Sequence, residues 1–184
     1  MKLYKPKFWD NKIGFLSVIL FPLSLIFIFL THLNRKISKR KVFKLPIICV
    51  GNIYLGGTGK TPTSIFLARE LSKLGKKAVI LRKYYKSHTD EYKLIKNSFK
   101  NLIINKNRAD GINDAEKNGF DFVILDDGLQ DHRINKNIKI VCFNSNQLIG
   151  NGLVFPAGPL RERLNSIKDA DIIIINGKKN ITFE

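Results

Sequence analysis

The chain has 184 residues, enough for one α/β domain with a hydrophobic core and a short appendage. Its 32 Lys and Arg against 15 Asp and Glu give a net charge of +17, which indicates an anionic partner: nucleic acid, anionic lipid or a phosphorylated substrate. Cys49 and Cys142 lie in apolar strand-like runs and are expected to be buried thiols. The three isolated histidines, without a CxxC pair, give no case for zinc.

The chain begins with a basic stretch over residues 1–12, which includes Lys2. Residues 13–30 then run for eighteen positions without a charge, which is the lower limit for crossing a bilayer. Pro22, in the middle of this run, is expected to kink or break a helix in water. A basic cluster follows, made of Arg35, Lys36, Lys39, Arg40, Lys41 and Lys44.

This N-terminal segment allows several interpretations. A cleaved signal peptide fits the basic start, but no small-residue cleavage site follows the apolar run. A spanning helix would have its basic C-terminal flank, and the rest of the chain, in the cytoplasm. A helix or hairpin inserted into one leaflet would rest the basic cluster on anionic headgroups, and a buried helix of the domain itself is the fourth alternative. We expect residues 1–44 to associate with a membrane and residues 45–184 to form the globular domain.

A glycine-rich loop with an adjoining Lys-Thr pair marks the start of that domain. The apolar residues 47–50 predict a buried strand, and residues 63–74 predict an amphipathic helix. Between them, glycines let backbone N–H groups turn toward phosphate oxygens, and the helix N-terminus favours anions. Lys60 would reach the β- and γ-phosphates, and the Thr61 hydroxyl would bind Mg²⁺. Tyr54 departs from the general pattern, which has glycine there. The predicted nucleotide-binding residues are Gly56, Gly57, Thr58, Gly59, Lys60, Thr61 and Pro62.

Strand-like and helix-like runs alternate through the rest of the chain. Strands are expected at residues 77–81, 102–104, 122–125, 138–143 and 171–175, and a further helix at residues 108–118. Short apolar runs separated in this way predict an α/β fold like that of P-loop NTPases, with a mostly parallel sheet flanked by helices.

Two acidic residues follow the expected strand at residues 122–125. Ligands of open α/β sheets collect at the carboxyl ends of strands, so Asp126 and Asp127 should face the glycine-rich loop and serve a metal site. A strand-end turn exposed to solvent is the alternative for this pair. Asp90 has the carboxylate that a phosphotransferase needs, although a position in the first turn of a helix explains it as well. Arg161 and Arg163 could clamp phosphate, although an isolated arginine more often lies on a helix surface.

The combination of GGTGKTP, DDGLQ and PAGPLRE behind an apolar segment resembles the tetraacyldisaccharide 4′-kinase family, the lipid A kinases of Gram-negative bacteria. The resemblance implies transfer of the γ-phosphate of ATP, with Mg²⁺, to the 4′-hydroxyl of a tetraacyl glucosamine disaccharide 1-phosphate. It places the reaction at the cytoplasmic face of the inner membrane and implies no nucleic-acid partner. The implied catalytic residues are Asp90 as base, Lys60 and Asp127; the implied metal ligands are Thr61, Asp126 and Asp127; the implied substrate-binding residues are Arg108, Gln130, Arg161 and Glu162.

Some positions depart from that family's pattern. The family's Ser-Arg-Gly stretch after the second strand reads Leu81-Arg82-Lys83-Tyr84-Tyr85 here. Thr89 replaces the glycine before Asp90. Asp131 separates Gln130 from the histidine, His132, that usually follows it directly. The family is also longer than this chain, with a C-terminal small domain, so we expect an apolar edge of the sheet to be exposed here and turnover to be impaired.

Two other functions fit parts of the sequence. Membrane-associated P-loop switch ATPases of the partitioning and division-site type share GG-x-GKT, but they carry a lysine where this chain has Leu55. A nucleic-acid-binding ATPase would explain the charge of +17, but the basic cluster lies beside the apolar segment, which favours lipid headgroups. A non-catalytic ATP-binding remnant of the kinase is a third alternative.

Overall fold

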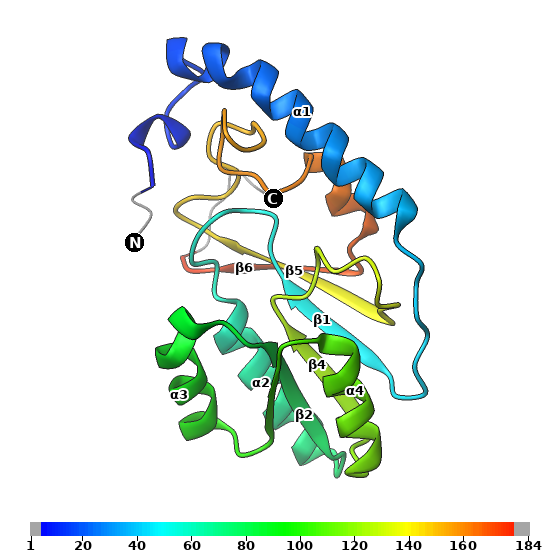
Figure 1. Ribbon diagram of the computed structural model, residues 1–184. Coiled ribbons are helices and arrows are strands. Elements are labelled where there is room, and N and C mark those ends of the chain that lie inside the picture. The colour runs from blue at the N-terminus through cyan, green and yellow to red at the C-terminus, as the bar shows by residue number, and fades with distance from the viewer. Residues whose placement is uncertain (1–4, 179–184) are drawn as a thin grey trace.

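The computed structural model describes residues 5–178, so Lys2 and residues 179–184 lie outside the described part of the chain. The described residues form a sheet of six parallel strands in the order β3-β2-β4-β1-β5-β6 (Figure 1). The strands are β1 (Ile47–Gly51), β2 (Ala78–Lys83), β3 (Leu102–Asn105), β4 (Phe122–Asp126), β5 (Ile138–Asn144) and β6 (Ile172–Asn176). The predicted parallel α/β fold is therefore confirmed.

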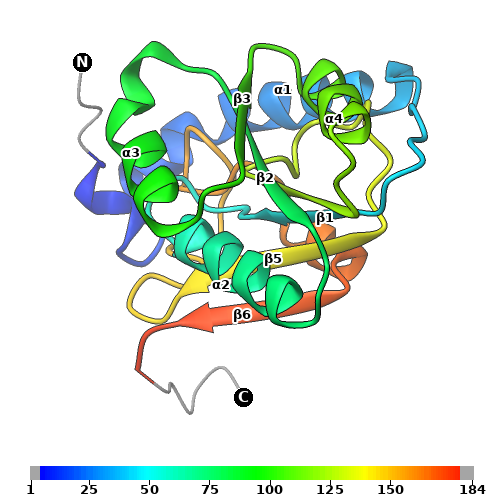
Figure 2. The same cartoon turned by 90° about the horizontal axis from the view of Figure 1, so that it is seen from below.

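Helices cover both faces of this sheet. The α-helices are α1 (Phe15–Ile37), α2 (Lys60–Lys73), α3 (Thr89–Ser98) and α4 (Arg108–Lys117). Short 3₁₀ helices are η1 (Lys7–Trp9), η2 (Lys86–His88) and η3 (Leu164–Asp169). Helices α2 and α3 pack against each other on one side of β2, and α4 lies on the other side (Figure 2). Helix α2 begins at Lys60, three residues earlier than predicted, so it starts directly at the glycine-rich loop.

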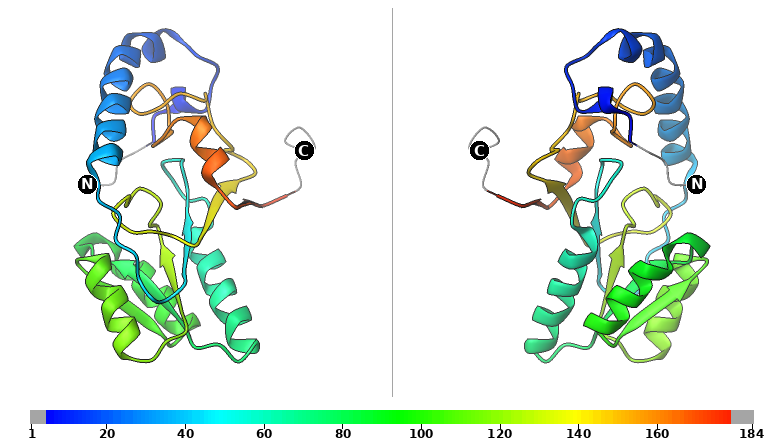
Figure 3. Two further views of the ribbon diagram at one scale, coloured as in Figure 1. Left: turned by 90° about the vertical axis from the view of Figure 1, so that its right-hand side faces the viewer. Right: turned by 90° about the vertical axis from the view of Figure 1, so that its left-hand side faces the viewer.

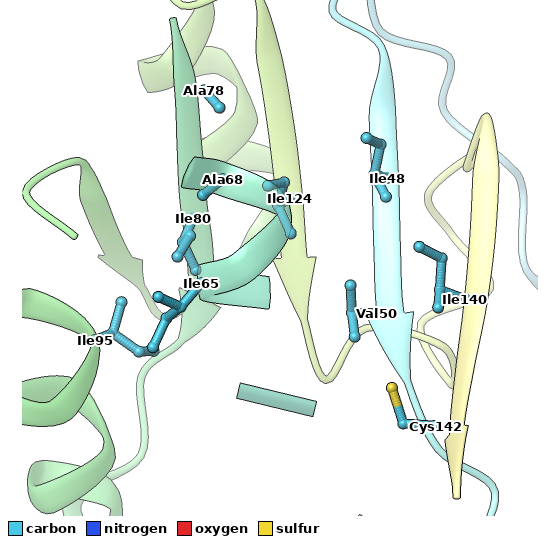
Figure 4. Packing of buried hydrophobic residues seen from close by; sticks show 10 residues of the cluster. All are labelled: Ile48, Val50, Ile65, Ala68, Ala78, Ile80, Ile95, Ile124, Ile140 and Cys142. Carbon is cyan, nitrogen blue, oxygen red and sulfur yellow. The ribbon is translucent and has the colours of Figure 1, made fainter. Parts of the chain in front are cut away.

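The core has two layers because successive side chains of a strand point to opposite faces of the sheet. Ile48 and Val50 of β1 face α2, in the cluster that Figure 4 shows, whereas Ile47 and Cys49 face α4. Cys142 belongs to the α2 layer. Both cysteines are free and buried, as predicted, and burial raises the pKa of the Cys49 thiol to about 11.

Helix α1 lies along the outside of the molecule, against the loop between β5 and β6 (Figures 1 and 3). It is continuous through Pro22, so of the expected kink or break, the break does not occur. Ser17 and Ser24, on either side of the proline, are buried and hydrogen bond to this loop, and such contacts offset the backbone bond that proline removes. The helix is long and apolar enough to cross a membrane, and only 11% of its most apolar part is buried, so it is not a core helix among residues 5–178.

Strand β6 forms one edge of the sheet. Its residues Ile172, Ile173 and Ile175 are all exposed to solvent. The expectation of an exposed apolar edge is therefore confirmed for the described residues.

Candidate active site

The glycine-rich loop between β1 and α2 is held in shape by side-chain amides. Asn52 Nδ2 donates hydrogen bonds to the carbonyls of Tyr54 (2.6 Å) and Gly56 (3.2 Å), and Asn176 Nδ2, at the end of β6, donates to the carbonyl of Thr58 (2.8 Å). Gly59 has φ +82°, and a Cβ there would lie 2.5 Å from Asn176 Nδ2, so glycine is required. The loop leads directly into the first turn of α2, whose free backbone N–H groups favour an anion.

Lys60, Thr61 and the two aspartates at the end of β4 meet as predicted. Thr61 Oγ1 donates a hydrogen bond to Asp126 Oδ2 (2.9 Å), and Lys60 Nζ lies 3.9 Å from Asp127 Oδ1. Ser64 Oγ donates to the other oxygen of Asp126 (3.3 Å). Asp127 has φ +63°, a left-handed conformation that directs it away from the path of β4. The turn is therefore part of a site rather than a solvated strand end.

The two aspartates have opposite electrostatic environments. Burial raises the pKa of Asp126, and the charge of Arg82 and the Thr61 hydrogen bond only partly oppose this. Burial would also raise the pKa of Asp127, but the positive charges of Lys60 and Arg161 outweigh it, so this pKa is lowered. Burial lowers the pKa of the Lys60 ammonium. The pKa values of the two neighbouring carboxyl groups are therefore shifted in opposite directions.

The four predicted substrate-binding residues surround Asp127. Arg161 Nη1 donates to Asp127 Oδ1 (3.2 Å) and to Gln130 Oε1 (3.3 Å). Gln130 Nε2 donates to Glu162 Oε1 (3.0 Å), and Arg108 donates to the carbonyl of Asp127. Arg161 is thus built into the site and is not a helix-surface residue; a short 3₁₀ helix, η3, follows it.

Asp90 is the predicted site residue that the structure does not bring to the others. It lies exposed in the first turn of α3, and its side chain makes no hydrogen bond or ion pair with any residue between 5 and 178. The neighbouring Glu91 does reach the site, through an ion pair with Arg82. A base role for Asp90 therefore stays a prediction.

Arg82, at the end of β2, was not among the predicted site residues. It is only 4% exposed, pairs with Asp126 and donates to Thr61 Oγ1 (3.0 Å). The apolar run that predicts β2 ends at Leu81, so Arg82 looks like an ordinary strand end. Its signal is the strand register, in which Arg82 lies directly opposite Asp126.

A cavity of about 450 Å³ opens beside Asp127. Its walls come from the last turn of α1 and the residue after it (Asn34 and Ser38), from the end of β2 and from the loops that follow β4 and β5. The basic residues that line it are Lys83, Arg108, Arg133 and Arg161. These positive charges favour an anionic group in the cavity.

A parallel sheet with this loop at the start of α2 and paired acids at the end of β4 defines a P-loop nucleotide-binding protein. The family model for LpxK, tetraacyldisaccharide-1-P 4′-kinase, matches residues 16–184. The chain therefore belongs to the tetraacyldisaccharide 4′-kinase family.

Individual relatives agree with this assignment. The chain is 45% identical to the tetraacyldisaccharide 4′-kinase of Pelagibacter ubique, over 97% of this chain and 57% of the relative, and 36% identical to that of Francisella philomiragia, over 95% and 60%. The crystal structure of "apo" form LpxK from Aquifex aeolicus in complex with ATP superposes with a TM-score of 0.77 at 26% identity, over 92% of this chain and 61% of that one. Because this chain spans less than two thirds of these proteins, family membership alone does not establish their activity for it.

Proposed function

We propose that the chain transfers the γ-phosphate of ATP to the 4′-hydroxyl of a tetraacyl glucosamine disaccharide 1-phosphate, a precursor of lipid A. The reaction uses Mg²⁺ and takes place at the cytoplasmic face of the bacterial inner membrane. Support comes from the named activity of the relatives, from ATP in the Aquifex structure and from the cavity at Asp127.

The cavity is the observation that carries the proposal. It joins the C-terminal end of the apolar helix α1, at Asn34 and Ser38, to Asp127 beside the glycine-rich loop. An acceptor whose acyl chains remain in the bilayer can therefore present its sugar to the nucleotide. The Nε atoms of Arg108 and Arg161 are buried without a hydrogen-bond partner among the described residues. Unpaired buried guanidinium donors are costly unless a ligand accepts from them, and a phosphate suits their planar geometry.

Helix α1 supports a membrane position for this cavity. The domain contacts it near its N-terminus at Ser17, in the middle at Ser24 and near its C-terminus, where Arg35 Nη2 lies 2.7 Å from Asp169 Oδ2. At 1.5 Å per residue these contacts extend over about 27 Å, close to the thickness of a bilayer core. A helix held to a polar domain over that length cannot cross the bilayer, so we propose that it lies in one leaflet with its free side in lipid.

The residues present fit nucleotide and metal. Oxygen ligands suit Mg²⁺, which commonly binds through one or two carboxylates and substrate phosphates. Thr61, Asp126 and Asp127 offer such oxygens. Residues 5–178 contain no group of three His, Cys, Asp or Glu side chains that could hold a metal ion, and a magnesium ion bound partly by phosphates does not require one. When bound, the ion would neutralise phosphate charge. Lys60 would neutralise charge on the β- and γ-phosphates from the first turn of α2.

The transfer itself requires one bond to form and one to break. The 4′-hydroxyl oxygen bonds to the γ-phosphorus, the bond from that phosphorus to the bridging oxygen of ADP breaks, and the hydroxyl proton passes to a carboxylate. We assign the acceptance of this proton to Asp90, on α3. The Asp127 carboxylate and the Arg161 guanidinium partly neutralise each other in the cavity. Positioning and electrostatics supply the catalysis in such reactions.

The test is transfer from γ-labelled ATP to the lipid acceptor in mixed micelles with Mg²⁺. We expect labelled lipid with the new phosphate at the 4′ position by ³¹P NMR, and loss of the label with Lys60→Ala and Asp90→Ala. ATP binding without transfer, or transfer to another position, would contradict the proposal for this chain.

A further inference from the structure

Arg82 connects two parts of the molecule that the nucleotide site alone does not require. One terminal nitrogen of its guanidinium, Nη1, lies in the site, where it pairs with Asp126 and donates to Thr61 Oγ1 (3.0 Å). The other terminal nitrogen, Nη2, pairs with Glu91, in the first turn of α3, and lies 3.4 Å from His88 Nδ1. One buried guanidinium therefore spans the gap between the glycine-rich loop and α3.

The first turn of α3 has few other attachments to the rest of the molecule. Ile95, two turns into the helix, is its buried residue. At the C-terminal end, the Arg69 guanidinium holds the carbonyl of Ser98 (2.8 Å). Tyr92 contacts the chain just before the helix, where its hydroxyl donates to the carbonyl of Lys83 (3.1 Å). The ion pair of Glu91 with Arg82 is thus what links this first turn to the nucleotide site.

Arg82 and a bound metal would both act on Thr61 and Asp126. Thr61 donates its hydroxyl proton to Asp126 and accepts a hydrogen bond from Arg82, so one of the two lone pairs of Oγ1 is taken and the other is free for a cation. A divalent cation at Oγ1 and Asp126 would bring two further positive charges close to Nη1 of Arg82, and like charges repel. Arg82 would then shift toward the phosphates, which offer it a new anionic partner, while Glu91 still holds Nη2.

We propose that Arg82 couples nucleotide binding to the position of the first turn of α3, and that it is a positioning residue for Asp90. This inference rests on the proposed function, because it uses nucleotide and metal at Thr61. The exchange of partners at Nη1 moves the guanidinium, and Glu91 transmits the movement to α3. With phosphate as an added anion, the guanidinium is more firmly fixed and the first turn of α3 becomes more rigid. If Arg82 were only the counter-ion of buried Asp126, α3 would not respond to nucleotide.

Hydrogen–deuterium exchange tests the coupling without relying on turnover. Glu91→Gln removes the charge that Arg82 contacts and changes no side chain that contacts Thr61 or Asp126. Glu70→Gln is the matched control, because Glu70 is a similarly exposed glutamate (42% against 47%) whose ion pair with Lys73 lies on α2. We expect Mg²⁺ with a non-hydrolysable ATP analogue to slow exchange across residues 89–95 about fivefold in the wild type, the size expected for a partly exposed ion pair.

The variants then separate the outcomes. Glu91→Gln should lose this slowing at residues 89–95 and keep both nucleotide affinity and protection at residues 56–64, whereas Glu70→Gln should behave like the wild type. Arg82→Lys keeps a charge beside Asp126 but cannot contact both Asp126 and Glu91, so it should also lose the slowing at residues 89–95. Nucleotide binding with no response of α3 in the wild type, or with an unchanged response in Glu91→Gln, would overturn the coupling alone. Failure to bind nucleotide at all would overturn the proposed function and the coupling together.

Discussion

Arg161 reaches Asp127 from a loop more than thirty residues further along the chain, with its Nη1 3.2 Å from Asp127 Oδ1. The contact brings the loop that follows β5 onto the carboxyl end of β4, and it places a positive charge against the carboxylate that Lys60 also faces. Arg161, which lines the cavity, and Lys60, which follows the glycine-rich loop, therefore act on the same carboxylate.

Removing Arg161 should raise the pKa of Asp127. Lys60 and Arg161 together lower that pKa against the effect of burial, and Arg161→Gln deletes one of the two charges. A carboxylate with a lowered pKa stabilises the fold above about pH 4, and this stability is lost as the pH falls through the folded-state pKa. Carboxyl ¹³C NMR should show Asp127 titrating at higher pH in Arg161→Gln, and acid unfolding should begin at higher pH. The exposed Arg163, changed to Gln, is the control. An unmoved titration would show that Arg161 does not act on Asp127.

The Thr61 hydroxyl should matter for metal-bound nucleotide in particular. Thr61→Ala removes the hydrogen bond to Asp126 and the oxygen offered to Mg²⁺. We expect about a tenfold loss of affinity for Mg²⁺-ATP, the size of one charge-assisted hydrogen bond, and little loss for ATP without Mg²⁺. Calorimetric titrations with and without Mg²⁺ check this, and Thr61→Ser should restore binding. Equal losses with and without the metal would contradict the metal role of Thr61.

Gly59 and Gly57 offer a paired test of the loop geometry. Gly59→Ala forces a Cβ to within 2.5 Å of Asn176 Nδ2 at φ +82°, whereas a Cβ at Gly57 meets nothing within 4 Å. We expect Gly59→Ala to lower the free energy of unfolding by about 1–3 kcal/mol and to weaken ATP binding. Gly57→Ala should change the free energy of unfolding by less than about 1 kcal/mol. Urea denaturation measures both. Similar effects of the two substitutions would show that strain at Gly59 is not the cause.

The free side of α1 should determine binding to lipid. Phe29 is 64% exposed on α1, and Phe66 is 60% exposed on α2. Since burying a phenylalanine side chain contributes about 1.5–3 kcal/mol, Phe29→Glu should weaken binding to anionic vesicles by about tenfold or more. Phe66→Glu makes the same chemical change away from α1 and should leave vesicle binding unchanged. Vesicle flotation compares the two variants. Equal flotation of Phe29→Glu and the wild type would contradict insertion of this face.

The sequence predicts the parts of the site that depend on one motif and its neighbouring strand. The proximity of Thr61 and Asp126 could be predicted, because the loop before α2 and the acid that follows β4 both lie at the carboxyl edge of a parallel sheet. The place of Arg82 in the site could not be predicted, since it depends on β2 lying next to β4, and a periodic sequence pattern does not show strand order. The sequence offered Arg161 only as one of two possible phosphate clamps, and Gln130 was identified through the family resemblance, because the hydrogen bonds from Arg161 to Asp127 and Gln130 link distant loops. The continuity of α1 through Pro22 depends on tertiary contacts of the same long-range kind.

The most direct test of the kinase account is to count where the label from γ-labelled ATP goes, in lipid and in free phosphate, with and without the tetraacyl disaccharide 1-phosphate. A switch ATPase and a lipid kinase both consume ATP, but only the kinase needs the acceptor. We predict that label accumulates in lipid in excess over free phosphate, and that little ATP is consumed when the acceptor is omitted. Hydrolysis at the same rate without the lipid, with no label in the lipid fraction, would contradict the account.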